Sequence, residues 1–162
     1  MTRGLVTRTG AALVAVLAVT GCSGPPGPSQ DEVTAWMDAQ DDAEVDGLLG
    51  SATGRVDPGD PEPSDATTGE EITLSFQTAA RLDGVRLSCL GDGVLDFDVY
   101  VTTAAGDGAT RTEVVAFADV PCGADARDEQ ITATDVVSVG VTGSGAEHAG
   151  AWHALVLGSA PA

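Results

Sequence analysis

The sequence predicts an all-β protein: an antiparallel β-sandwich of about seven strands, preceded by a short N-terminal helix and a flexible tether. Three observations predict this fold class. From residue 70 onward, apolar and polar side chains alternate, as in strands that bury one face. Clusters of glycine and aspartate, which favour turns, separate the alternating stretches. Apolar residues at helical spacing are absent from the same region.

The expected sandwich covers residues 70–158. The clearest alternation runs through residues 95–102, where apolar side chains point one way and polar side chains the other. The core is expected to consist chiefly of valine, leucine and alanine, because aromatic residues make up only 4% of the chain. The other expected strands lie at residues 72–76, 85–89, 114–117, around 131, 137–141 and 152–157.

Residues 29–50 predict a short helical segment. Ser29 and Glu32 have the spacing of a capping box, in which two side chains satisfy free backbone donors at a helix start. Val33, Trp36 and Met37 then fall on one helical face. We expect this face to pack on the main domain, and a helix that binds a partner is the alternative.

The helical segment is expected to reach Gly50, since Val45, Leu48 and Leu49 can extend it or form a second turn. Residues 51–69 predict a linker. Prolines and acidic residues dominate residues 57–65, and such a composition cannot bury enough apolar surface to offset its ordering entropy.

The first 21 residues predict an export signal. Arg3 and Arg8 form a positively charged start, and residues 11–19 form an apolar run. That run is too short to span a bilayer core of about 30 Å as a helix. A small residue, Gly21, stands directly before Cys22. The order of charge, apolar run, small residue and cysteine therefore favours export over a transmembrane anchor.

The motif formed by residues 19–22, Val-Thr-Gly-Cys, resembles the lipobox of bacterial lipoproteins. The resemblance implies that the thiol of Cys22 receives diacylglycerol and that the chain is cleaved before it. Palmitate-type acyl chains would then anchor the protein on the extracytoplasmic face of the cell membrane, and residues 22–28 would be the lipidated tether. An ordinary secretory signal, in which Cys22 is incidental, is the alternative.

Two further cysteines, Cys89 and Cys122, predict a disulfide in such an oxidising compartment. Closing this loop can stabilise the fold by roughly 4 kcal/mol on the chain-entropy model. Cys89 should point inward from its strand, so the bridge is expected to join two core strands or the two sheets. Two free buried thiols are the alternative, and the paired spacing of a cysteine metal site is missing.

The segments 89–93 and 120–123, Cys-Leu-Gly-Asp-Gly and Val-Pro-Cys-Gly, are similar to a pattern in uncharacterised actinobacterial lipoproteins. That resemblance implies a disulfide-linked β-sandwich behind a lipobox, over roughly residues 70–158. It implies no particular activity.

Charge excludes one class of partner. The chain carries 25 acidic residues against 7 arginines and no lysine, a formal net charge of −18. Such a surface repels nucleic acid and anionic lipid headgroups. The excess of acid either keeps an exported domain soluble or forms an acidic binding surface. The lack of lysine also excludes Schiff-base chemistry on the protein.

Two carboxylates are weak candidates for a metal site. Asp96 and Asp98 lie two residues apart on an expected strand, so both project from one face. The alternative is a solvated face opposite the buried residues. The glycine–aspartate turns do not match the calcium-loop template, and Asp92 and Asp107 are interpreted as turn residues.

Catalytic motifs are not found in the sequence. His148 and His153 are five residues apart and share no helical or strand face, and the G-x-S-x-G and phosphate-loop motifs are missing. We therefore predict a non-enzymatic binding or envelope-structural module without cofactor, acting as a monomer. Its partner would be a cell-envelope glycan or protein, with Tyr100 or Trp152 stacking on sugar. A calcium- or metal-dependent binding module and a hydrolase with an unrecognised site are the alternatives.

Overall fold

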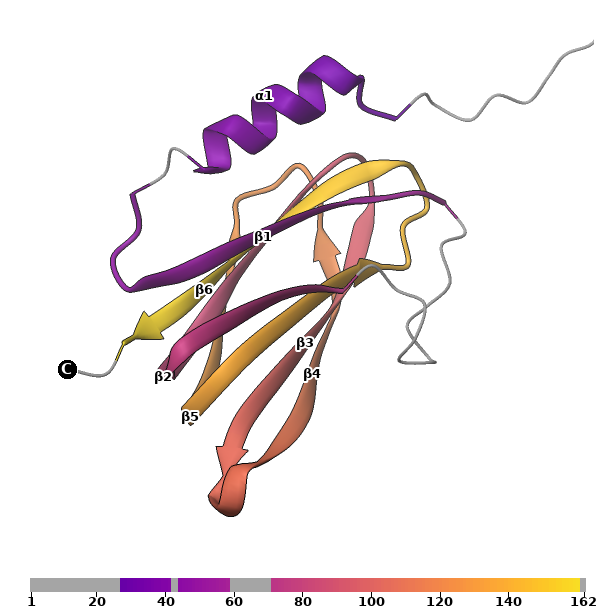
Figure 1. Cartoon of the computed structure of the whole chain (residues 1–162). Helices are drawn as coiled ribbons and strands as arrows, with labels where there is room; N and C mark the ends of the chain where they lie inside the picture. Colours follow the sequence, from indigo (N-terminus) through magenta and orange to yellow (C-terminus); the bar gives the residue numbers. More distant parts are fainter. Residues whose placement is uncertain (1–26, 42–43, 59–70, 161–162) are drawn as a thin grey trace, which may run out of the picture.

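A computed structural model describes residues 27–41, 44–58 and 71–160 of the chain (Figure 1). The expected export signal, Cys22, residues 22–26 of the tether and residues 59–69 of the linker lie outside these ranges. The elements are α1 (Gln30–Asp41), β1 (Leu48–Val56), β2 (Ile72–Leu90), β3 (Val94–Ala105), the 3₁₀ turn η1 (Gly106–Gly108), β4 (Ala109–Pro121), β5 (Arg127–Ser144) and β6 (Gly150–Ser159).

The strands of the described residues form one antiparallel sheet in the order β1-β6-β2-β5-β3-β4. The prediction of an all-β antiparallel fold is confirmed. The described residues form six strands rather than about seven. Strands β2 and β5 are 19 and 18 residues long and each contains two of the expected short strands, while β1 is a strand that was not expected. The expected strands at 72–76 and 85–89 are the two ends of β2, and those near 131 and 137–141 belong to β5.

The sheet bends because its two long strands change direction without breaking. The first part of β2 pairs with the second part of β5, and the last part of β2 pairs with β6. Between these parts the register shifts repeatedly from Ser75 to Gly84, and Asp135 on β5 has a positive φ of 58°. Such bulges kink a strand and increase its twist. Thus β2 and β5 contribute to two layers, a β1–β6 layer and a β3–β4 layer.

The hydrophobic core lies between the two layers and centres on Trp152. Its ring stands edge-on to Phe97 of β3, with ring centroids 6.0 Å apart and an interplanar angle of 86°. Trp152 is 2% exposed and therefore cannot stack on a sugar, so that part of the binding prediction is wrong. Gly54 of β1 and Gly143 of β5 lie against the ring, where a methyl group would collide with it. Valines and leucines complete the core, as expected.

Strand β1 corrects the predictions for residues 48–56. These residues were expected to end a helical segment and begin a linker, but they pair with β6 from Leu48 to Val56. The positions of β1 that face the core are Ala52, Gly54 and Val56, so the alternation has little hydrophobic contrast. Glycine is needed at position 54 because the Trp152 ring occupies the space that a side chain would fill. The expected linker therefore begins no earlier than Asp57.

Helix α1 packs on the outer face of the β1–β6 layer, as expected for its apolar side (Figure 1). Its capping box forms, since the Ser29 backbone N–H donates to Glu32 Oε2 at 2.8 Å and the Glu32 N–H donates to Ser29 Oγ at 3.3 Å. The Trp36 ring meets His153 of β6 edge-on at 6.4 Å. Val33 and Leu155 are also buried, so a second, smaller apolar layer holds the helix on the sheet.

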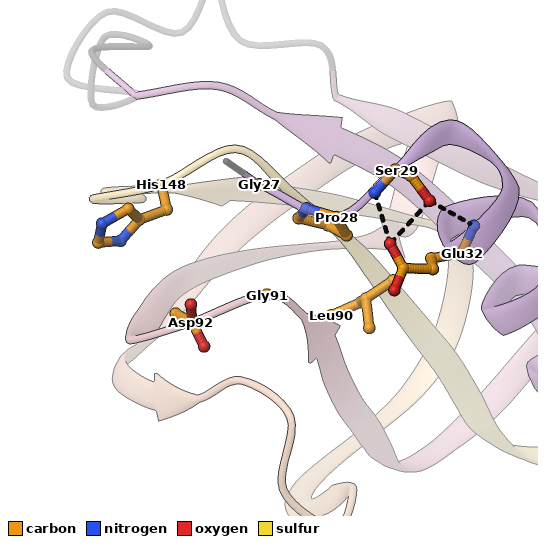
Figure 2. Close-up of a pocket in the computed structure, with 8 residues that line it drawn as sticks. All are labelled: Gly27, Pro28, Ser29, Glu32, Leu90, Gly91, Asp92 and His148. Carbon is orange, nitrogen blue, oxygen red and sulfur yellow. Dashed lines mark hydrogen bonds between the residues drawn. The ribbon is translucent and has the colours of Figure 1, made fainter. Parts of the chain in front are cut away.

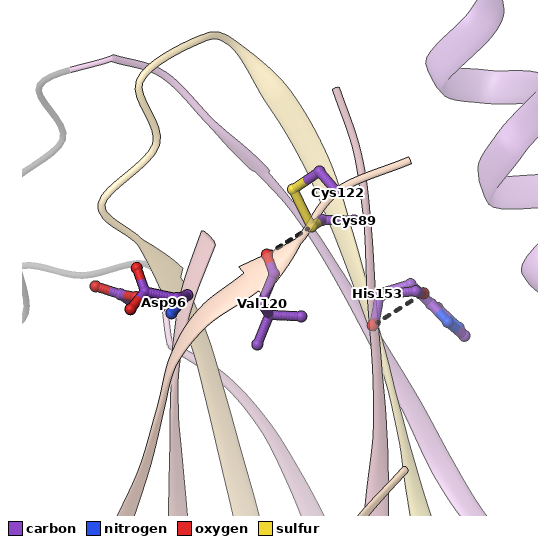
Figure 3. The surroundings of a disulfide bond; sticks show 7 residues. Cys89, Asp96, Val120, Cys122 and His153 are labelled. Atoms are coloured by element: carbon purple, nitrogen blue, oxygen red, sulfur yellow. Dashed lines mark hydrogen bonds between the residues drawn. A yellow bond between two sulfur atoms is a disulfide. The ribbon is translucent and has the colours of Figure 1, made fainter. Parts of the chain in front are cut away.

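The predicted disulfide forms between Cys89 and Cys122, whose Cα atoms are 4.6 Å apart (Figure 3). Cys89 lies one residue before the end of β2, and Cys122 directly follows β4. Two backbone hydrogen bonds flank the bridge: Cys122 N–H donates to the Gly93 carbonyl at 3.0 Å, and Gly123 N–H donates to the Cys89 carbonyl at 2.9 Å. The bridge therefore joins the end of β2 to an edge strand of the other layer.

We expect Gly54→Ala to destabilise the fold, because an added Cβ would lie 2.5 Å from Cε2 of Trp152. Overpacking of this kind costs about 1–3 kcal/mol. The matched control is Gly106→Ala, since no atom lies within 4 Å of a Cβ added there. Thermal unfolding followed by circular dichroism checks both variants. Equal melting temperatures for the two would contradict the tight fit of the Trp152 ring.

Removing the disulfide with Cys89→Ser and Cys122→Ser together should cost roughly 4 kcal/mol, because the bridge closes a loop between residues 33 apart. Denaturant unfolding with and without reductant measures the effect. Reductant should lower the stability of the parent and leave the double variant unchanged. A double variant as stable as the oxidised parent would show that the bridge contributes nothing to stability.

Candidate functional site

An open pocket of about 520 Å³ lies at the end of the fold where the chain enters α1 (Figure 2). We call this end the tether pole and define it by residues 27–29, 90–93 and 148–149. Three separate segments meet there: the entry to α1, the β2–β3 turn and the loop before β6. The residues that line the pocket are Gly27, Pro28, Ser29, Glu32, Leu90, Gly91, Asp92 and His148.

Close backbone packing shapes this pole. A Cβ added to Gly27 would lie 2.8 Å from the Ala149 carbonyl oxygen, so the entering chain passes directly against the β5–β6 loop. The β2–β3 turn uses Gly91 and Gly93 at φ of 134° and 90°, conformations that favour glycine. The disulfide next to this turn holds it in place. The pocket is thus built on backbone that the fold constrains from several sides.

The pocket is acidic and contains no arginine among its lining residues. Hydrogen bonds from the Ser29 hydroxyl and then from the Ser29 backbone N–H lower the pKa of Glu32 below its ordinary value. The Nδ1 atom of His148 is buried without a hydrogen-bond partner. The carboxylates of Glu32 and Asp92 can therefore accept hydrogen bonds from a ligand at this pole.

The same pocket brings a serine, a histidine and two acids together, but it does not form a nucleophilic site. The Ser29 hydroxyl donates to Glu32 Oε2 at 2.7 Å, and His148 lies across the pocket on another segment (Figure 2). A serine nucleophile requires a base within hydrogen-bond reach of its hydroxyl. The contacts of Ser29 therefore serve the helix start.

Asp96 and Asp98, the two carboxylates that the sequence offered as a weak metal site, have different neighbours in the sheet. Asp96 Oδ1 accepts a hydrogen bond from the backbone N–H of Asp119 at 2.8 Å, where β4 has a bulge with φ of 55°. This hydrogen bond links Asp96 of β3 to the edge strand β4. Asp98 lies on the outer face of the β3–β4 layer, beside Tyr100. The part of the chain that the structure describes contains no group of three or more metal-ligating side chains.

The remaining candidates also lie apart. Asp107 has φ of 69° in η1, which confirms its interpretation as a turn residue, and Asp92 lines the pocket. His153 is 1% exposed and faces α1, whereas His148 lies in the loop before β6. No pattern in the sequence singles out Glu71 or Thr142, because only the pairing of β2, β5 and β3 places them on the same face of the sheet as Asp98.

No known protein family, curated protein or solved structure matches the chain. Among residues 27–41, 44–58 and 71–160, no helix is long and apolar enough to cross a membrane.

The capping box predicts a pH-dependent attachment of α1. Hydrogen bonds from Ser29 lower the pKa of Glu32 below its ordinary value of 4.5. The ionised Glu32 side chain therefore stabilises the start of α1 above that pH, and this stabilisation is lost as the pH falls through the lowered pKa. Glu32→Gln should therefore loosen α1 at neutral pH and match the parent in acid. Ser29→Ala should cost about 1 kcal/mol at neutral pH. Trp36 fluorescence during unfolding reports both effects.

Asp38→Asn is the control, since it removes a carboxylate from the same helix away from the capping box. If Asp38→Asn and Glu32→Gln changed the pH profile equally, general charge on α1 would explain the effect and the capping interpretation would be wrong.

Proposed function

We propose that the protein is a membrane-anchored extracytoplasmic lipoprotein that acts as a non-enzymatic binding or envelope-structural module. The observation that carries this proposal is the Cys89–Cys122 disulfide. Disulfides persist in oxidising compartments, which supports export. The bridge also uses two of the three cysteines of the chain, which leaves Cys22 without a partner of its own kind. A cysteine that carries lipid needs no protein partner.

The place where the chain enters the fold supports an orientation at the membrane. Gly27 packs against Ala149 at the tether pole and follows Cys22 by five residues. A chain of that length spans at most about 18 Å when fully extended. A lipid on Cys22 would therefore hold the tether pole, with its pocket, close to the bilayer. The β3–β4 hairpin lies at the other end of the sheet (Figure 1).

The character of the pocket supports binding rather than catalysis. Its polar groups can accept hydrogen bonds, and its serine hydroxyl is engaged with Glu32. The partner we propose is a glycan or protein of the cell envelope, bound by a monomer, and the acidic surface makes nucleic acid an unsuitable partner. The tether would keep such a module in permanent reach of the envelope.

Intact-mass spectrometry of the chain purified from bacterial membranes tests the anchor. We expect a protein that begins at Cys22 and carries a mass increment for diacylglycerol and any further acyl chain. Cys22→Ser should release the protein from the membrane fraction, whereas Ser23→Ala, the matched control, should leave it there. A membrane form with an unmodified Cys22 thiol would overturn the proposal.

A further inference from the structure

The edge strand β4 has a free side along its whole length. Among the described residues it pairs with β3 and with no other strand (Figure 1). Alternate backbone N–H and C=O groups of this 13-residue strand therefore point away from the sheet. The strand at the opposite edge, β1, has nine residues and contains Gly50 and Gly54, which weaken a strand. The edge better suited to accept a further strand is therefore β4.

The two ends of β4 are protected against pairing, but its middle is not. Arg111 and Glu113 form an ion pair near one end, with Nη2 and Oε1 2.9 Å apart. Near the other end Asp119 forms a bulge with φ of 55°, and Pro121 is the last residue of the strand. Charges, bulges and prolines are features that protect edge strands in natural proteins. Residues 114–118, Val-Val-Ala-Phe-Ala, contain no charge, proline or glycine.

The apolar side chains of this middle segment are incompletely covered. Val114 is 55% exposed, and Leu48 of β1, at 44%, is the other exposed large apolar side chain in the described part of the chain. Val115 and Phe117 pair with buried residues of β3 and point toward the core, but each is only partly buried. A strand added beside β4 would place its own side chains against these two residues.

Side-chain interactions hold β4 in place at several points. The hydroxyls of Thr102 and Thr112 hydrogen bond to each other at 2.8 Å, and the Asp119 N–H donates to Asp96 Oδ1 at 2.8 Å. The disulfide fixes Cys122, directly after the strand. An edge that is already ordered loses less conformational entropy when another strand pairs with it. The free edge of β4 is therefore preorganised for pairing.

We propose that β4 binds an extended segment of a partner protein as an added strand. Backbone hydrogen bonds give such a complex its affinity, and side chains at alternate positions give it specificity. Glu113 and Asp119 flank the uncharged segment, one at each end. The ion pair of Glu113 with Arg111 is exposed and therefore weak, so this carboxylate can also bind a partner's cation. The segment that complements this edge has alternating apolar residues and a basic residue at each end.

The net charge of the chain, −18, favours a basic partner and opposes a second copy of the same chain as the occupant. The surface is separate from the pocket at the tether pole, whose lining residues come from other elements. It does not depend on lipid at Cys22. An unmodified Cys22 would overturn the anchor alone, and failure of strand addition would leave the anchor intact.

Nuclear magnetic resonance titration of the full chain in a non-ionic detergent tests the proposal. The probe is a capped peptide, Lys-Thr-Val-Thr-Val-Thr-Lys. Paired with residues 113–119, it places valines opposite Val115 and Phe117 and lysines opposite Glu113 and Asp119. We expect saturable shifts of the backbone amides of residues 113–118 and slower hydrogen exchange in this segment. The absence of saturable shifts, or shifts confined to β1, would overturn the proposal.

Three control peptides separate strand pairing from other contacts. One carries N-methyl groups on its threonines and a second carries them on its valines, so each blocks the amides of one edge of the peptide. Because only one edge can face β4, one of these peptides should lose binding and the other should keep it. Equal binding by both would exclude an added strand. A third peptide, with glutamates in place of its lysines, should bind about fivefold more weakly.

A lysine in the uncharged segment should block the edge. We expect Val114→Lys to raise the dissociation constant of the lysine-ended peptide about fivefold, because like charges then face each other. Leu48→Lys is the matched control, since it makes the same change at an exposed residue of the other edge strand. Equal affinities of the two variants would contradict binding at β4. Sedimentation velocity of the parent without peptide checks the occupant: a dimer that Val114→Lys abolishes would identify a second copy and overturn the proposal.

Discussion

The Trp152 ring between the two layers is the contact on which the rest of the fold depends. A sheet that bends over itself must bring β6 against β3, and the edge-on packing of Trp152 on Phe97 occupies that junction. Gly54 and Gly143 leave room for the ring. Aromatic residues make up 4% of the chain, so a single large ring replaces many smaller contacts. The ring also explains why β1 has a glycine at position 54, where a strand would otherwise place a core side chain.

The disulfide holds the same two layers together at one end. It joins the last residues of β2 to the residue after β4, and the β2–β3 turn and the entry to α1 lie beside it. Residues that are far apart in the chain are thereby fixed at the tether pole. The pocket at this pole is therefore built on constrained backbone.

The acidic residues have different structural roles, although all of them carry the same charge. Glu32 caps a helix, Asp96 holds a bulge of β4, and Asp128 pairs with Arg86 across two strands at 2.6 Å. That pair is largely exposed, so its contribution to stability is small. Glu71 accepts a hydrogen bond from the Thr73 hydroxyl at 2.8 Å.

The sequence by itself determined the all-β class and the capping box of α1, because these follow from local alternation and local spacing. It also indicated the pairing of Cys89 with Cys122, because the lipobox resemblance sets Cys22 apart from the other two cysteines. Tertiary structure decided the rest. Whether β2 is one strand or two depends on bulges, which leave no gap in the alternation. β1 becomes a strand because its backbone pairs with that of β6, and because the glycine at position 54 leaves room for the Trp152 ring. The tether pole arises only when tertiary packing brings the entry to α1, the β2–β3 turn and the loop before β6 together, because these segments lie far apart in the chain.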